Sequence, residues 1–195
     1  EALAKAAWNG QTVLLAMDQA DLGDRMALLV MALRVGDRAL PLAWRAEAGP
    51  ANIGFEGQQR LLEQVRAWLP AGVKVLLSAD RFYPSAALFG WIQTHGWGYR
   101  LRLQGNVLAD TGQGDETTTG QLAQGAAERY LSGVRLFTQE RMTNLGILHE
   151  AGHPEPWIIA ARWAIEPMFS DFKGRGFDLE GSQLGHADRL ERLVL

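Results

Sequence analysis

Two aspartates, Asp18 and Asp80, each come after a short apolar run, and carboxylates in such a position can hold divalent metal ions. The runs are TVLLAM at residues 12–17 and VKVLL at residues 73–77. Their length and their branched side chains are typical of buried strands. If two such strands are neighbours in a sheet, both carboxylates project from the same edge and can share magnesium beside a phosphate. The pattern therefore favours metal-dependent chemistry on phosphate esters.

The elements that must position these aspartates follow a recognisable order. Apolar patterns predict strands at residues 12–17, 27–35, 39–44, 73–77 and 99–103, and helices at residues 56–69 and 84–95. Gly36 and Asp37 favour a tight antiparallel turn, and the polar segment 19–25 fits a hairpin loop beside Asp18. Three strands, a helix, a strand, a helix and a strand are the series expected of a ribonuclease H-like sheet.

The second half of the chain is predicted to be rich in strands. Residues 105–125 are rich in glycine, threonine, aspartate and glutamine and are interpreted as loop or hairpin. Short strands are predicted at residues 134–137, 144–149 and 157–160. Helical spacing returns at residues 162–173. This arrangement predicts a β-rich insertion, residues 104–160, before a final helix.

The final predicted helix carries Arg162, Glu166 and Lys173 with the spacing R-x3-E-x6-K, which places all three on one helical face. This spacing resembles the arginine, glutamate and lysine of the tyrosine-arginine-glutamate-lysine signature in one large group of bacterial insertion-sequence transposases of the DDE type. The blocks DQADLGDR around Asp18, ADRFYPS around Asp80 and RWAIEPMFSDFKGRGFDLE around Glu166 also resemble that family. The resemblance extends over nearly the whole chain.

The resemblance implies an α/β, ribonuclease H-like fold, with a mixed sheet flanked by helices and the β-rich insertion placed before the helix of the catalytic glutamate. It implies that Asp18, Asp80 and Glu166 are catalytic and bind two Mg²⁺ or Mn²⁺ ions. The implied activity is metal-dependent hydrolysis at transposon ends, followed by attack of the freed 3′-hydroxyl on target DNA. No covalent protein intermediate is expected.

The resemblance also implies contacts with DNA. Arg162 and Lys173 are expected to contact phosphates of the transposon end, and Arg81 is a further candidate because it directly follows Asp80. Weaker candidates for a DNA-facing patch are Arg25, Arg100, Arg102 and Arg175. The expected partners are transposon-end and target DNA and further copies of the chain on that DNA. The expected location is the bacterial cytoplasm, in association with the nucleoid.

Two positions depart from the family pattern. Ile159 stands where the signature has its tyrosine, so the role of that tyrosine is not carried over. Pro167 directly follows Glu166, and proline is tolerated only in the first turn of a helix. The helix therefore either begins near Ile165 or is kinked beside the glutamate.

Composition limits the class of protein. The 195 residues are 47% hydrophobic, enough for one substantial core, and the longest apolar run, residues 26–33, is too short for a membrane helix. No membrane association is expected. The absence of cysteine excludes thiolate zinc sites, and the net charge of −3 argues against a surface that grips nucleic acid everywhere. The first residue is Glu1 and residues 189–195 end inside a helix-like pattern, so a fragment, residues 1–195, of a longer protein is expected.

Two other functions share these residues. A ribonuclease H-like nuclease would use the same acids and cut DNA without joining it, and a strand-transfer assay separates it from a transposase. An inactive DNA-binding remnant of a transposase would show no metal-dependent nicking. Among other polar residues, Asp21, Asp24 and Asp171 are interpreted as capping or solvated groups. The four histidines are interpreted as structural, since their spacing is not that of a helical zinc pair.

Overall fold

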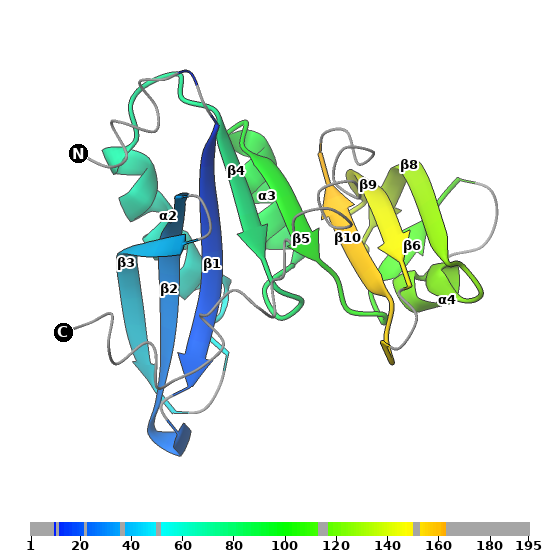
Figure 1. The fold of residues 1–195 in the computed structure, drawn as a ribbon, viewed down its shortest axis with the longest axis horizontal. Helices are drawn as coiled ribbons and strands as arrows, with labels where there is room; N and C mark the ends of the chain where they lie inside the picture. Colours follow the sequence, from blue (N-terminus) through cyan, green and yellow to red (C-terminus); the bar gives the residue numbers. More distant parts are fainter. Residues whose placement is uncertain are drawn as a thin grey trace. The chain divides into compact units, whose positions relative to one another are not determined.

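The computed structural model describes residues 10, 12–21, 23–35, 38–49, 52–112, 117–149 and 153–162. The described residues fall into two compact units, the first ending at Ser78 and the second beginning at Ala79. Each unit contains strands and at least one helix, which makes the protein a mixed α/β molecule (Figure 1). No helix in these ranges is long and apolar enough to cross a lipid bilayer.

The first unit is built on an antiparallel meander. Its strands lie in the order β3-β2-β1-β4, with bounds β1 Val13–Asp21, β2 Met26–Val35, β3 Arg38–Ala48 and β4 Val75–Ala79. A short 3-10 helix, η1 (Gly23–Arg25), connects β1 to β2. Asp21 pairs with Ala27 and Val35 pairs with Arg38, so both predicted hairpins are confirmed. The backbone N–H of Val13 donates to the Lys74 carbonyl at 2.8 Å, which ties the start of β1 to the segment before β4.

On one face of this sheet the side chains of β1 and β2 are buried. Leu15 lies opposite Leu33 and Met17 opposite Met31, and none of the four is more than 2% exposed. Helix α2 (Phe55–Trp68) packs against β2 and β3 (Figure 1). Its buried side chains recur at helical spacing, as the sequence predicts: Leu61, Leu62 and Val65. Side chains alternate along a strand, so the neighbours of Met17 in β1 point to the opposite face.

Gly57 permits the close approach of α2 to β3. A Cβ atom at this position would lie 2.8 Å from Oε1 of Glu47. Glu47 is held there by an ion pair with Arg45, whose Nε lies 2.8 Å from the same oxygen. The same Cβ atom would lie still closer to Cγ2 of Ile53, so a larger residue would have to displace the side chains of Ile53 and Glu47.

The second unit contains an antiparallel sheet in the order β5-β10-β9-β8-β6-β7, in which every neighbouring pair is antiparallel. The bounds are β5 Gly98–Arg102, β6 Leu108–Asp110, β7 Thr117–Thr118, β8 Glu128–Leu136, β9 Arg141–Leu148 and β10 Trp157–Ala161. Helix α3 (Ala86–Thr94) packs against β5 and β9. The Phe89 and Tyr99 rings meet edge to face at 5.1 Å, and the buried Tyr99 hydroxyl donates to Thr143 Oγ1 at 3.0 Å.

The segment predicted as loop or hairpin contains more structure than expected. The pairing of β6 with β7 confirms the hairpin, but the short helix α4 (Thr119–Ala123) was not predicted. Thr118 caps this helix, because its hydroxyl accepts from the Gln121 N–H and the Gln121 side chain accepts from the Thr118 N–H. A reciprocal cap can define a five-residue helix without any apolar periodicity.

Candidate functional site

Asp18 lies inside β1, opposite Val30 of β2, and does not follow the end of a strand as predicted. The strand continues because Gln19 and Asp21 keep their backbone pairing with β2 although their side chains are polar. The Oδ1 atom of Asp18 accepts from the Gln19 N–H at 2.8 Å. By the alternation of the strand, the half-buried Asp18 side chain lies on the face opposite Met17 and belongs to the first unit.

Asp80 follows β4, as predicted, although this strand ends at Ala79, two residues later than the predicted strand, and Asp80 belongs to the second unit. Its Oδ1 atom is buried and has no hydrogen-bond partner among the described residues. Nη1 of Arg102 lies 3.5 Å from this oxygen, a distance that gives an ion pair without a formed hydrogen bond. The buried oxygen of this carboxylate therefore has a neighbouring positive charge and no hydrogen bond from the described residues.

Arg102 is held between this carboxylate and an aromatic ring. Its Cζ atom lies 4.1 Å from the centre of the Trp157 ring, and its side chain is only 11% exposed. Alternation along β5 explains the position, since Tyr99 and Leu101 are buried on one face and Arg102 stands on the other. The sequence marked Arg102 only as a weaker DNA contact, whereas the structure places it beside Asp80.

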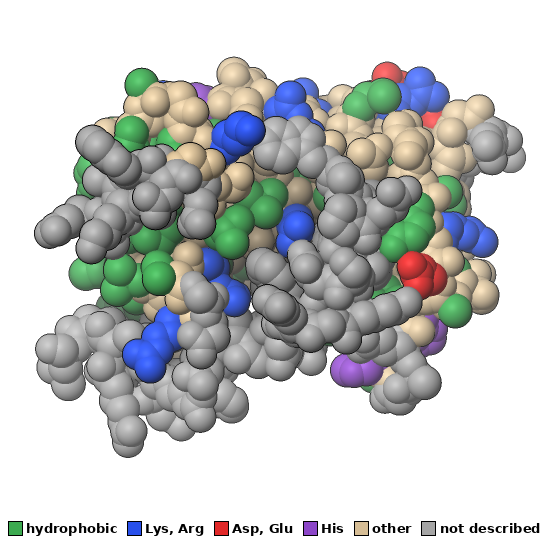
Figure 2. All heavy atoms as spheres, turned by 45° about the horizontal axis from the view of Figure 1, so that its top comes forward, with side chains coloured by type: hydrophobic (Ala, Val, Ile, Leu, Met, Phe, Trp, Pro, Cys, Tyr) green, Lys and Arg blue, Asp and Glu red, His purple; other side chains and the backbone are tan. Residues whose placement is uncertain are grey.

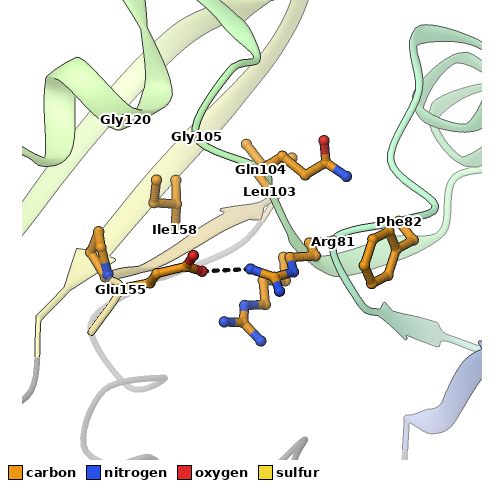
Figure 3. Close-up of a pocket in the computed structure, with 10 residues that line it drawn as sticks. Arg81, Phe82, Leu103, Gln104, Gly105, Gly120, Glu155 and Ile158 are labelled. Atoms are coloured by element: carbon orange, nitrogen blue, oxygen red, sulfur yellow. Dashed lines mark hydrogen bonds and ion pairs between the residues drawn. The ribbon is translucent and has the colours of Figure 1, made fainter. Parts of the chain in front are cut away.

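A pocket of about 380 Å³ lies in the second unit. One of its lining residues is Arg81, which directly follows Asp80 in the sequence. Figure 3 shows Arg81 and Glu155 pointing toward each other across the pocket from two separate segments. Arg81 Nη1 and Glu155 Oε2 are 2.5 Å apart. The lining residues are Arg81, Phe82, Arg102, Leu103, Gln104, Gly105, Gly120, Glu155, Pro156 and Ile158. The sequence did not mark Glu155, because no local pattern reveals a contact over 74 residues.

One wall of the pocket is made of backbone. The Gly120 N–H donates to the Gly105 carbonyl at 2.7 Å, and a Cβ atom on Gly120 would lie 2.8 Å from that oxygen. The Thr119 hydroxyl donates to the Gln104 carbonyl at 2.6 Å and fixes the same contact one residue earlier. The two chain segments can approach this closely only because Gly120 lacks a side chain.

The rest of the lining is apolar and aromatic. Leu103 directly follows β5 and Ile158 lies in β10, and the Leu103 N–H donates to the Ile158 carbonyl at 2.7 Å. Phe82 is 54% exposed, and the Arg81 guanidinium lies 5.5 Å from the centre of its ring. Exposed hydrophobic side chains also stand among basic ones on the surface shown in Figure 2. Guanidinium groups beside an apolar wall and an aromatic ring suit an anionic ligand that also carries a flat apolar part.

The predicted site residues are only partly within the described structure. Asp80, Arg81 and Arg162 belong to the second unit, where Arg162 is exposed directly after β10. Asp18 belongs to the first unit. Glu166 and Lys173 lie outside the described residues. Within the described ranges no three His, Cys, Asp or Glu side chains gather as a metal site. The three-acid centre therefore stays a prediction.

The residues present fit a magnesium-type ion in their chemistry. Such ions take carboxylate oxygens and keep several waters, so they need few protein ligands. Oδ1 of Asp80 is an oxygen donor that no described N–H or O–H group occupies. Arg102 could neutralise this carboxylate when no ion is bound, because its guanidinium is already beside it.

No protein-family model and no curated protein matches the chain. Among solved structures, Endonuclease V of Ciona intestinalis in complex with DNA is similar at 10% identity, over 77% of this chain and 71% of that chain, with a TM-score of 0.44. The catalytic domain of human Endonuclease V has 12% identity over 83% and 72%, with a TM-score of 0.40. The Argonaute of Marinitoga piezophila with guide RNA and target DNA has 8% identity over 83% and 25%, with a TM-score of 0.37. With TM-scores below 0.5, these overlays establish neither the fold nor the activity of this chain.

Proposed function

We propose that this protein is the catalytic core of a DDE transposase with a ribonuclease H-like fold, which cuts transposon ends and joins them to target DNA. The observation that carries the proposal is the surroundings of Asp80. Its buried oxygen accepts no hydrogen bond from the described residues, and the next residue, Arg81, lines a pocket together with Arg102. The sequence resemblance at the blocks around positions 18, 80 and 166 supports the same assignment.

Asp18, Asp80 and Glu166 are the residues proposed to hold two Mg²⁺ or Mn²⁺ ions. Bound there, the ions would supply Lewis acidity for the attacking and the leaving oxygens of a phosphate ester. Arg81 would neutralise the phosphate, because a guanidinium group can donate two parallel hydrogen bonds to its oxygens, while Arg102 would stay paired with Asp80. Arg162 and Lys173 would bind phosphates of the transposon end and hold the strand in register.

The proposed reaction has two phosphoryl transfers at one site. In the first, water attacks the phosphorus at the transposon end, the P–O bond to the leaving strand breaks, and a free 3′-hydroxyl results. In the second, this hydroxyl attacks a target phosphate and the target strand leaves. The number of phosphodiester bonds is conserved in the second step, so joining requires no external energy source. A homo-oligomer would hold two ends together.

The test is cleavage and joining of a supercoiled plasmid that carries the DNA flanking the coding sequence, in Mg²⁺ or Mn²⁺. Asp80→Asn and Glu166→Ala should each reduce nicking by about 10³-fold, equivalent to roughly 4 kcal/mol of transition-state stabilisation. Cleavage by Glu166→Ala at the wild-type rate would refute the assignment. Nicking without any joined product would favour a nuclease instead.

A further inference from the structure

The charged residues of the second-unit pocket are two arginines and one acid. Arg81, Arg102 and Glu155 are the charged members of its lining, and Asp80, which pairs with Arg102, brings the sum of the four charges to zero. Arg102 is engaged by Asp80 and by the Trp157 ring, and it is nearly buried. Arg81, which is 36% exposed, is the arginine that a ligand entering the pocket can reach.

Glu155 occupies this accessible arginine. Its Oε2 lies 2.5 Å from Nη1 of Arg81, and Figure 3 shows the two side chains meeting across the pocket. Carboxylates and phosphates are bound by the same guanidinium fork, with the same planar pattern of hydrogen bonds. The Glu155 carboxylate therefore takes the position at Arg81 that an oxygen of a phosphate would take.

This contact can be displaced. Glu155 is 63% exposed, and exposed ion pairs contribute no more than about 1 kcal/mol, about a fivefold change in an equilibrium constant. A single free phosphate gains little by replacing it. A nucleic-acid strand is held by several contacts at once. Displacing Glu155 from Arg81 therefore uses only a small share of the strand's total binding free energy.

We propose that Glu155 is an internal competitor for Arg81, which occupies the guanidinium until a backbone phosphate of the nucleic acid displaces it. The inference rests on the proposed function for the identity of its ligand. Glu155 then lowers the affinity of this pocket for every nucleic acid. Strands that also contact other parts of the protein bind in spite of this loss. Its removal should strengthen binding without adding any new contact.

Binding of fluorescein-labelled single-stranded and double-stranded 20-mers, in EDTA, tests the proposal by fluorescence anisotropy. Glu155→Gln keeps the size of the side chain and removes its charge. We expect it to lower the Kd about fivefold. Glu63→Gln is the matched control, because Glu63 also forms an exposed ion pair, with Arg66 at 2.8 Å, and lies in the first unit. It changes the net charge equally and should leave the Kd within about twofold, because its ion-pair partner is Arg66 and not Arg81.

A double-mutant cycle locates the effect. Arg81→Gln should weaken binding, and adding Glu155→Gln to it should bring no further change. Equal effects of Glu155→Gln and Glu63→Gln would overturn the proposal, as would tighter binding that persists without Arg81, or no DNA binding by any variant. Thermal unfolding confirms that each variant is folded. Binding in EDTA requires no cleavage. The role of Glu155 and the transposase activity can therefore be refuted separately, the first by the anisotropy measurement and the second by the plasmid assay.

Discussion

At the scale of single residues, the contact between Arg102 and Asp80 makes a prediction about stability. The Arg102 side chain is 11% exposed and neutralises a carboxylate whose Oδ1 is buried. Arg102→Gln should lower the free energy of unfolding by about 1–3 kcal/mol, because it leaves that charge without its counter-ion and removes the cation from the Trp157 ring. Urea denaturation measures this loss.

The same contact has an internal control. In an Asp80→Asn background, Arg102→Gln should lower the free energy of unfolding by less than it does in the wild type. The difference, the coupling energy, should be at least about 0.5 kcal/mol, because the carboxylate that Arg102 neutralises is gone. Identical costs in the two backgrounds would show that Arg102 stabilises the fold by packing alone.

At the scale of elements, the approach of α4 to the segment before β6 makes a sharp packing prediction. Gly120→Ala should destabilise the second unit by about 1–3 kcal/mol, because its Cβ atom would lie 2.8 Å from the Gly105 carbonyl oxygen. Gly105→Ala is the matched control from the same contact, since its Cβ atom would meet the nearest atom, Gly120 Cα, at an ordinary 3.5 Å. Thermal unfolding compares them, and equal stabilities of the two variants would contradict the geometry.

The strand pair β6 and β8 carries a pH-dependent contact. The Gly112 N–H donates to Oδ1 of Asp110 at 2.6 Å and holds the pKa of that carboxyl below its ordinary value of 3.8. Partial burial opposes this lowering of the pKa, and Arg135, whose Nη2 lies 2.6 Å from Oδ2, adds to it. A lowered folded-state pKa contributes stability above 3.8 that is lost as the pH falls through the folded value.

Asp110→Asn therefore makes a directional prediction. Wild type should be more stable than the variant near neutral pH, and the difference should shrink as the pH falls below the ordinary value of 3.8. Thermal unfolding of both proteins across this range checks it. A difference that stays constant, or grows, with acidification would show that the charge of Asp110 does not stabilise the unit.

How far the elements follow from the sequence depends on whether local patterns or distant contacts decide them. Helix α2 and strand β2 were predicted within a residue at each end, because local patterns define them: helical periodicity ending at Pro70 for α2, and an apolar run for β2. The first half of β8, from Glu128, was missed because those side chains are mostly exposed and the backbone pairing with β9 alone holds them in the strand. Asp18 was misplaced for a related reason, since polar residues after Met17 continue to pair with β2.

The residues of the site also differ in whether local sequence or distant contacts determine their positions. The position of Asp80 directly after β4 follows from the apolar run before it. Arg102 and Glu155 could not be assigned from the sequence, because their roles depend on pairing between β5 and β10 and on a contact across 74 residues. Catalytic roles for Asp18 and Glu166 stay predictions that rest on the sequence blocks.

At the scale of the whole molecule, a protein with a net charge of −3 is proposed to bind DNA. The second-unit pocket shows how this is possible, since two arginines line it within an acidic protein. Acidic residues that bind metal ions and basic residues that bind phosphates cancel in the net charge of the protein. Binding to DNA then depends on the charges near the contact and not on the net charge. The two units contribute different predicted ligands, Asp18 from the first and Asp80 from the second.

The central claim is that Asp18, Asp80 and Glu166 share divalent metal ions. Anomalous diffraction from crystals soaked in Mn²⁺ tests it most directly, because the signal locates the ions without reference to activity. The account predicts anomalous peaks in contact with carboxylate oxygens of all three residues, and their loss in Asp80→Asn crystals soaked in the same way. Peaks at other residues only, or three carboxylates that do not converge on a common ion, would contradict it.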